Sequence, residues 1–118
     1  MKKIFKLIII ILLLTACGKD KYKLITTNEA IELINDGATI IDVRTPEEYS
    51  REHISGAINI PLDMIDSISI DTSSKIVVYC QSGMRSKQAV EKLAKLGYKN
   101  LYNLDGGLLN WGGSLEEE

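Results

Sequence analysis

The stretch that decides the fold is KIVVYCQSGMRSKQAVEKLAKL, residues 75–96. Residues 75–79 contain an apolar, β-branched run, which is typical of a buried strand. Residues 86–96 repeat apolar side chains at helical intervals, and Gly97 follows as a natural helix stop. The residues between these two elements therefore form a strand-to-helix loop.

Shorter elements alternate on both sides of this stretch. Thr26 with Glu29, and Thr45 with Glu48, have the spacing of helix-capping boxes, and Pro46 suits the first turn of the second helix. Strands are predicted at 24–25, 39–43, 57–60 and 101–102. Strands separated by helices indicate an α/β domain with a small, mainly parallel, five-stranded sheet flanked by helices.

The loop begins with Cys80, which follows the predicted carboxyl end of a buried strand. Ligands bind at this edge of a parallel sheet, and backbone N–H groups and the following helix favour an anion there. Such surroundings lower the pKa of a thiol. Gly83 allows the loop to curl, Arg85 adds a fixed positive charge, and Ser86 is predicted to cap the helix.

Composition excludes several classes of function. The 118-residue chain has 14 basic and 16 acidic residues, so its net charge of −2 gives no reason to expect nucleic-acid binding. With two Cys, one His and no CxxC pair, the sequence gives no reason to expect a zinc site, and nothing indicates a haem or nucleotide cofactor.

The first seventeen residues have the pattern of an export signal. Lysines at 2, 3 and 6 precede an apolar run at 7–14, which is too short to span a bilayer. The following Leu14-Thr15-Ala16-Cys17 resembles a bacterial lipobox. This resemblance implies cleavage of a signal peptide at 1–16, lipidation of Cys17, a tether at 17–23, and a location on the extracytoplasmic face of the cell envelope membrane. The alternative is an uncleaved N-terminal helix with an incidental Cys.

Five stretches of the chain, in order, resemble the single-domain rhodanese-like sulfurtransferases: 40–44, 47–49 with 53–61, 77–86, and 104–107 with Trp111. The resemblance implies a three-layer rhodanese-like domain at 24–113, followed by an acidic tail at 114–118. It also implies a thiolate at Cys80 that takes a sulfane sulfur from thiosulfate or a persulfide and passes it to a thiol-type acceptor. The persulfide would be held by the loop residues Gln81, Ser82, Gly83, Met84, Arg85 and Ser86.

Two other functions compete with sulfur transfer. Four residues separate Cys80 from Arg85, whereas phosphatase loops of similar type have five, so the shorter loop disfavours phosphate. The second alternative is a rhodanese-like module at the cell envelope that binds sulfur, an anion or a partner without turnover. The single Arg in the loop favours this alternative, because it gives little attraction to thiosulfate.

Polar residues outside the loop are interpreted as support for it. Asp42 is expected to accept hydrogen bonds from nearby backbone N–H groups, and Arg44 to pair with Glu48 or another acid. We interpret His53 as a hydrogen-bonded structural residue at a turn. Whether Arg85 contacts substrate or only orders the loop is left open. Gly106, Gly107 and Trp111 are expected to pack near the site.

Overall fold

A computed structural model describes residues 21–118, so the predicted leader and Cys17 lie outside the described residues. Within residues 21–118, no helix has the length and apolar character needed to cross a membrane. The elements are β1 (Lys23–Ile25), α2 (Thr27–Asn35), β2 (Thr39–Asp42), α3 (Pro46–Arg51), β3 (His53–Ile54), β4 (Ile58–Asn59), the 3₁₀ helix η1 (Leu62–Ser67), β5 (Lys75–Tyr79), α4 (Met84–Lys95), β6 (Asn100–Leu104), the 3₁₀ helix η2 (Gly107–Asn110) and β7 (Leu115–Glu116).

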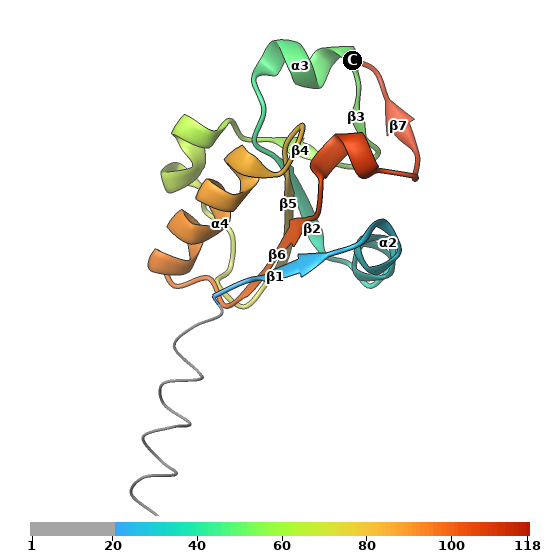
Figure 1. Cartoon of the computed structure of the whole chain (residues 1–118). Coiled ribbons are helices and arrows are strands. Elements are labelled where there is room, and N and C mark those ends of the chain that lie inside the picture. Colours follow the sequence, from blue (N-terminus) through green and yellow to red (C-terminus); the bar gives the residue numbers. More distant parts are fainter. Residues whose placement is uncertain (1–20) are drawn as a thin grey trace, which may run out of the picture.

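The five predicted strands form one sheet. Its order is β1-β6-β5-β2-β4, and each neighbouring pair is parallel. Val78 on the central strand β5 lies opposite Ile41 on β2 and Asn103 on β6. The parallel arrangement brings the residues that follow Asp42 and Tyr79 to one edge of the sheet (Figure 1). The predicted α/β fold class is confirmed.

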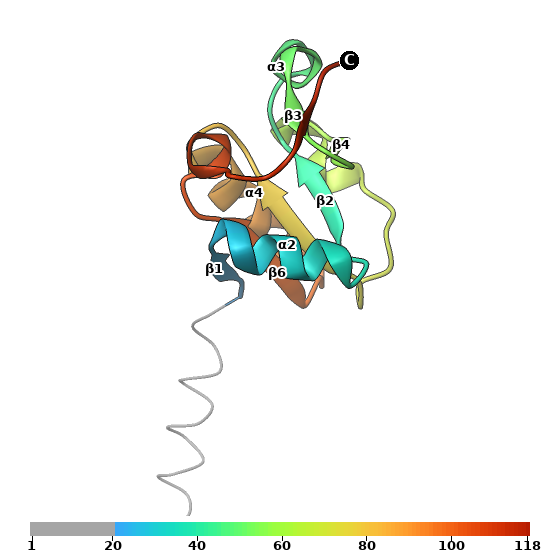
Figure 2. The same cartoon turned by 90° about the vertical axis from the view of Figure 1, so that its right-hand side faces the viewer.

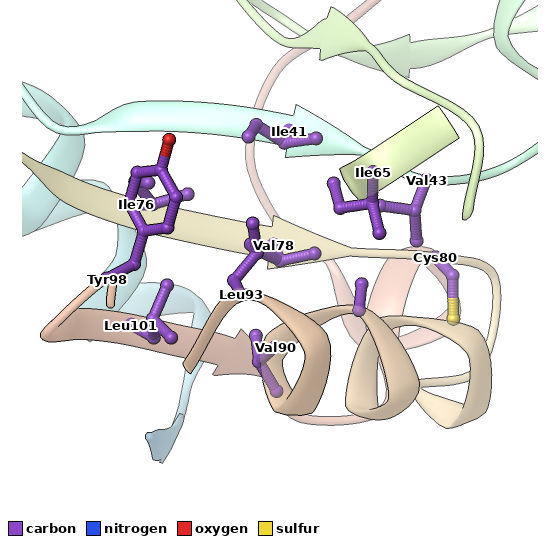
Figure 3. Close-up of a cluster of buried hydrophobic side chains, with 11 residues drawn as sticks. Ile41, Val43, Ile65, Ile76, Val78, Cys80, Val90, Leu93, Tyr98 and Leu101 are labelled. Atoms are coloured by element: carbon purple, nitrogen blue, oxygen red, sulfur yellow. The ribbon is translucent and has the colours of Figure 1, made fainter. Parts of the chain in front are cut away.

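Helices cover both faces of this sheet (Figures 1 and 2). On one face, Ile76 and Val78 of β5 pack with Val90 and Leu93 of α4 in a cluster that also includes Ile65 of η1 (Figure 3). On the other face, Val77 and Tyr79 belong to a second cluster that includes residues of α2 and β3. The central strand is thus buried on both faces, which explains its continuous apolar run.

Both predicted capping boxes are present. The Thr26 hydroxyl accepts the N–H of Glu29 at 3.2 Å, and the Glu29 carboxylate accepts the N–H of Thr26 at 3.0 Å. Thr45 and Glu48 form the same reciprocal pair at the start of α3, at 3.1 and 3.3 Å. These contacts satisfy N–H groups that have no partner inside the helix.

A small second sheet was not predicted. β3 pairs antiparallel with β7, so the acidic tail lies alongside the domain. The Glu116 carboxylate accepts the N–H of Gly56 at 2.6 Å, and the N–H of Glu118 donates to the Ser50 carbonyl at 3.0 Å. Two-residue strands are too short to show an alternating pattern in sequence, which is why this pairing was missed.

Candidate active site

The loop after β5 turns into α4 two residues earlier than predicted, at Met84. Gly83 is the N-cap residue and has a φ of 104°, a left-handed conformation that favours glycine. Because Gly83 has no side chain, it cannot cap the helix with one, and the prediction that Ser86 caps the helix is wrong. Ser86 instead lies inside the first turn, because Gly83 lets the chain enter the helix immediately after the curl.

The sulfur of Cys80 occupies the position that a capping oxygen usually takes. Its Sγ accepts the backbone N–H of Gly83 at 3.1 Å and that of Ser86 at 3.4 Å. The Ser86 hydroxyl lies 3.5 Å from Sγ and 3.1 Å from the Gly83 carbonyl oxygen, so its proton can serve either acceptor. We call these two N–H groups and this hydroxyl the sulfur cradle; Figure 3 shows the sulfur beside the first turn of α4.

The sulfur cradle favours the ionised thiol. Cys80 is 1% exposed, and this burial alone opposes ionisation. Hydrogen bonds from the Ser86 hydroxyl and N–H, and from the N–H groups of Gly83 and Ser82, act in the other direction and lower the pKa of the Cys80 thiol below its ordinary value. The thiolate is the nucleophilic form of cysteine, so this geometry prepares Cys80 for attack on an electrophilic sulfur.

The segment η2 supports the loop from the C-terminal side. The N–H of Leu108 donates to the Cys80 carbonyl at 2.9 Å, and the N–H of Leu109 donates to the Gln81 carbonyl at 3.2 Å. Gly107 has a φ of 57°, and a Cβ there would lie 2.3 Å from the Cys80 carbonyl oxygen. This close approach requires glycine, so the expected packing of Gly107 near the site is confirmed. The hydrogen bonds from the N–H groups of Leu108 and Leu109 could not be predicted from the sequence, because any residue other than proline carries such a donor.

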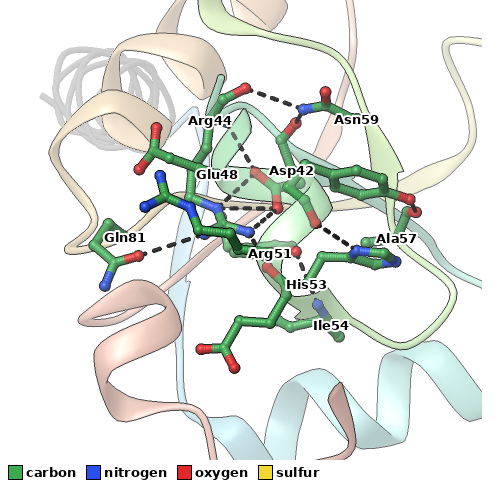
Figure 4. Close-up of polar contacts among 12 residues, drawn as sticks. Asp42, Arg44, Glu48, Arg51, His53, Ile54, Ala57, Asn59 and Gln81 are labelled. Atoms are coloured by element: carbon green, nitrogen blue, oxygen red, sulfur yellow. Dashed lines mark hydrogen bonds and ion pairs between the residues drawn. The ribbon is translucent and has the colours of Figure 1, made fainter. Parts of the chain in front are cut away.

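Asp42 and Arg44 form a buried ion pair that contacts the loop through Gln81 (Figure 4). Asp42 is 0% exposed and Arg44 is 3% exposed. The Asp42 carboxylate accepts the Arg44 backbone N–H at 2.9 Å, as predicted, and the Arg44 guanidinium at 2.7 to 3.0 Å. Arg44 therefore pairs with an acid other than Glu48, which is the second of the two predicted alternatives. The guanidinium also donates to the Glu52 carbonyl at 2.6 Å and contacts the Gln81 carboxamide at 3.5 Å.

Glu48 pairs instead with Arg85, the charged residue of the loop. The two side chains form a bidentate contact with N···O distances of 2.7 and 3.0 Å. Arg85 lowers the pKa of Glu48 to about 2, and Glu48 in turn raises the pKa of Arg85. Arg85 thus ties the loop to the first turn of α3. The sequence contained one signal for this contact, since the capping box fixes where the Glu48 carboxylate lies.

His53 makes the predicted hydrogen bond, but it lies in β3 and not at a turn. Its ring is 2% exposed and stacks on Tyr49 with 3.7 Å between ring centroids. Nδ1 lies 2.8 Å from the Tyr49 carbonyl oxygen, and Nε2 lies 3.9 Å from the Glu118 carboxylate. Within residues 21–118, no three His, Cys, Asp or Glu side chains converge as metal ligands.

Neighbouring loop residues line two clefts. Gln81 lines a cleft of about 430 Å³ together with Arg44, Glu48, Arg51, Glu52 and Leu108. Ser82, Gly83 and the exposed Met84 line another of about 470 Å³, with Asn103, Asp105 and Gly106 among its other residues. The structure thus brings all seven predicted loop residues to the carboxyl edge of the sheet, with a hollow surface on each side of the loop.

Comparisons with known proteins agree with this architecture. The chain is 42% identical over 81 residues to the uncharacterized protein YqhL of Bacillus subtilis, an alignment that covers 67% of this chain and 64% of YqhL. It is 44% identical over 70 residues to the thiosulfate sulfurtransferase PspE of Escherichia coli, covering 56% of this chain and 67% of PspE. The chain therefore spans slightly less than two thirds of YqhL.

A solved structure and a family model extend the likeness over most of residues 21–118. The rhodanese-like domain protein of Staphylococcus aureus superposes with a TM-score of 0.73 at 35% identity, covering 81% of this chain and 98% of that one. The model of the rhodanese-like domain matches residues 26–114. The chain belongs to the rhodanese-like domain family.

Proposed function

We propose that this chain is a sulfurtransferase that carries a sulfane sulfur on Cys80 as a persulfide. The observation that carries the proposal is the sulfur cradle, which places backbone N–H groups against a thiol and lowers its pKa. Relatives named as sulfurtransferases, such as PspE, support the same chemistry.

The first half of the reaction loads the protein. The Cys80 thiolate attacks the outer sulfur of a donor such as thiosulfate, and the bond between the two donor sulfur atoms breaks. The electron pair of that bond leaves with sulfite, so Cys80 gains one sulfur and no external oxidant is needed. The new terminal sulfur carries a negative charge, which the N–H groups at the start of α4 stabilise.

The second half unloads the protein. An acceptor thiolate attacks the terminal sulfur of the persulfide, and the electron pair of the broken bond returns to Cys80 as thiolate. Because Cys80 alternates between two covalent states, we expect ping-pong kinetics. Among residues 21–118, the side chain within hydrogen-bonding distance of Sγ is the Ser86 hydroxyl, and an ionised thiol needs no general base.

Intact mass spectrometry tests the proposal. The purified full-length Cys17→Ser variant, in which Cys80 is the one remaining thiol, is incubated with thiosulfate. We expect a gain of one sulfur atom that an added thiol removes, and no gain when Cys80→Ser is also present. Absence of a one-sulfur adduct with thiosulfate, an alkanethiosulfonate anion and an organic persulfide would contradict the proposal.

One observation favours the non-turnover module as the second candidate. Arg85 is already paired with Glu48, so the loop holds no uncompensated Arg for an anionic donor. In the same experiment, a module would gain sulfur in a one-to-one ratio and keep it when thiols are added. Discharge to a thiol over many cycles would support the enzyme.

We further propose that Cys17 is lipidated and holds the domain at the extracytoplasmic face of a bacterial membrane. Support comes from the basic start, the apolar run at 7–14 and the Leu14-Thr15-Ala16-Cys17 sequence. Cys17→Ala is expected to leave an unprocessed precursor in the cells that produce it. Cleavage of this variant at the normal rate would contradict the proposal.

A further inference from the structure

The charges around the 430 Å³ cleft compensate one another. Arg44 is paired with Asp42 at 2.7 Å, and Glu48 is paired with Arg85 at 2.7 Å. The remaining charged residues of the cleft lining are Arg51 and Glu52, one of each sign. The loop therefore stabilises negative charge mainly through backbone N–H groups, which can cover one sulfur atom but give little attraction to a distant second charge.

Building on the proposed function, we infer that Glu48 determines which donors this site uses, by cancelling the charge of Arg85. The site around Cys80 is then suited to sulfur donors of low charge, such as organic persulfides and alkanethiosulfonate anions. It is poorly suited to the dianion thiosulfate. Glu48 acts through Arg85 and through its own negative charge, so it is a specificity-determining residue and does not touch the reacting sulfur atoms.

The geometry explains why Glu48 holds Arg85 so firmly. Its Oε1 accepts the N–H and the hydroxyl of Thr45, both at 3.1 Å, as well as one N–H of Arg85. The Thr45 contacts hold the carboxylate at the start of α3 independently of Arg85. A guanidinium bound through two parallel hydrogen bonds has lost much of its freedom to turn toward a substrate.

Two sulfur donors of similar shape but different charge distinguish an effect of donor charge on the rate from an effect of donor size. Thiosulfate carries two negative charges, and methanethiosulfonate replaces one charged oxygen with a methyl group and carries one. The Cys80 thiolate attacks the outer sulfur of either donor, and the leaving group is sulfite or methanesulfinate, respectively. Both reactions give the same persulfide, so a ratio of their rates reports only on recognition of the donor.

The experiment compares Glu48→Gln with the parent. Glutamine retains an Oε1 that can accept the Thr45 N–H, so the helix cap is kept while the charge is removed. We expect the kcat/KM for thiosulfate, divided by that for methanethiosulfonate, to rise about tenfold. The rise is expected mainly in KM, and it should shrink at high salt because screening weakens the charge of Arg85.

Two further variants control for indirect effects. Glu47→Gln removes a neighbouring exposed charge of α3 that is not paired with the loop, and its ratio should stay within twofold of the parent. The double variant Glu48→Gln with Arg85→Gln restores a neutral pair, and its ratio should return toward the parent value. An unchanged ratio in Glu48→Gln, or an equal rise in Glu47→Gln, would overturn the inference. Failure of both donors to load the parent would instead contradict the proposed function.

Discussion

The loop that follows β5 is held by two supports that differ in burial. The buried support consists of Asp42, Arg44 and Gly107, which lie against the loop, and its two charged side chains are at most 3% exposed. The exposed support is the Glu48–Arg85 pair at the protein surface, where the Glu48 side chain is 23% exposed and the Arg85 side chain is 35% exposed. Removing one partner of a buried ion pair leaves an unpaired buried charge, so it greatly lowers the free energy of unfolding. Removing one partner of an exposed pair lowers it little. Substitutions at the exposed pair can therefore change specificity without unfolding the domain.

The largest expected effect is the loss of Arg44. Arg44→Met leaves the buried Asp42 carboxylate without its partner, and we expect a loss of about 3–5 kcal/mol in the free energy of unfolding. Arg85→Met, at the exposed support, should cost less than about 1 kcal/mol. Urea unfolding followed by the fluorescence of the one Trp, Trp111, measures both. Equal losses would show that the distinction between the two supports is wrong.

The buried support can also be tested by adding a Cβ at Gly107. A Cβ in Gly107→Ala would clash with the Cys80 carbonyl and adopt a left-handed φ, so we expect a cost of about 3 kcal/mol and slower persulfide formation. Gly37→Ala is the matched control, since Gly37 has a φ of 97° and nothing lies within 4 Å of the added Cβ. That control should lose about 1 kcal/mol and keep its reactivity. Similar losses in both variants would remove the argument for close packing against the loop.

The sulfur cradle can be tested at Ser86. Ser86→Ala removes the hydroxyl 3.5 Å from Sγ, so the pKa of the Cys80 thiol should rise. At a pH where the thiol is mostly protonated, we expect alkylation by iodoacetamide to slow about fivefold, which corresponds to one hydrogen bond of about 1 kcal/mol. Ser82→Ala keeps its backbone N–H and should behave like the parent. A pH profile of alkylation that does not move in Ser86→Ala would contradict this role.

The smallest effect concerns acid stability at the exposed support. The pKa of Glu48 is about 2 in the folded protein and 4.5 ordinarily, so its contribution to stability is present above pH 4.5 and is lost as the pH falls toward 2. Because the pair is partly exposed, we expect this contribution to be less than about 1 kcal/mol. Urea midpoints of the parent and Glu48→Gln between pH 6 and 2 should converge at the acidic end. A constant difference across this range would contradict the assignment.

Much of this architecture was predictable from sequence because its determinants are local. The run at 75–79, the two capping boxes and the glycine at 83 each specify a nearby conformation, and the parallel sheet follows from their alternation. The ion-pair partners were harder to predict from the sequence, because Arg44, Glu48 and Arg85 each had more than one possible partner of opposite charge. The choice depends on how β2, α3 and the loop sit in space. The pairing of β3 with β7 likewise depends on distant contacts that two-residue segments do not encode.

The register of the parallel strands also places the start of the described chain near the loop. Lys23 of β1 and Val77 of β5 both pair with Tyr102, so Lys23 is level with a residue three positions before Cys80. Three strand residues span about 10 Å. Lys21 and Tyr22, which precede β1, line the 470 Å³ cleft together with Ser82 and Met84. If lipid attached at Cys17 holds the protein, as we propose, the anchored end of the domain therefore adjoins this cleft, and donors or acceptors at the membrane surface would be close to it.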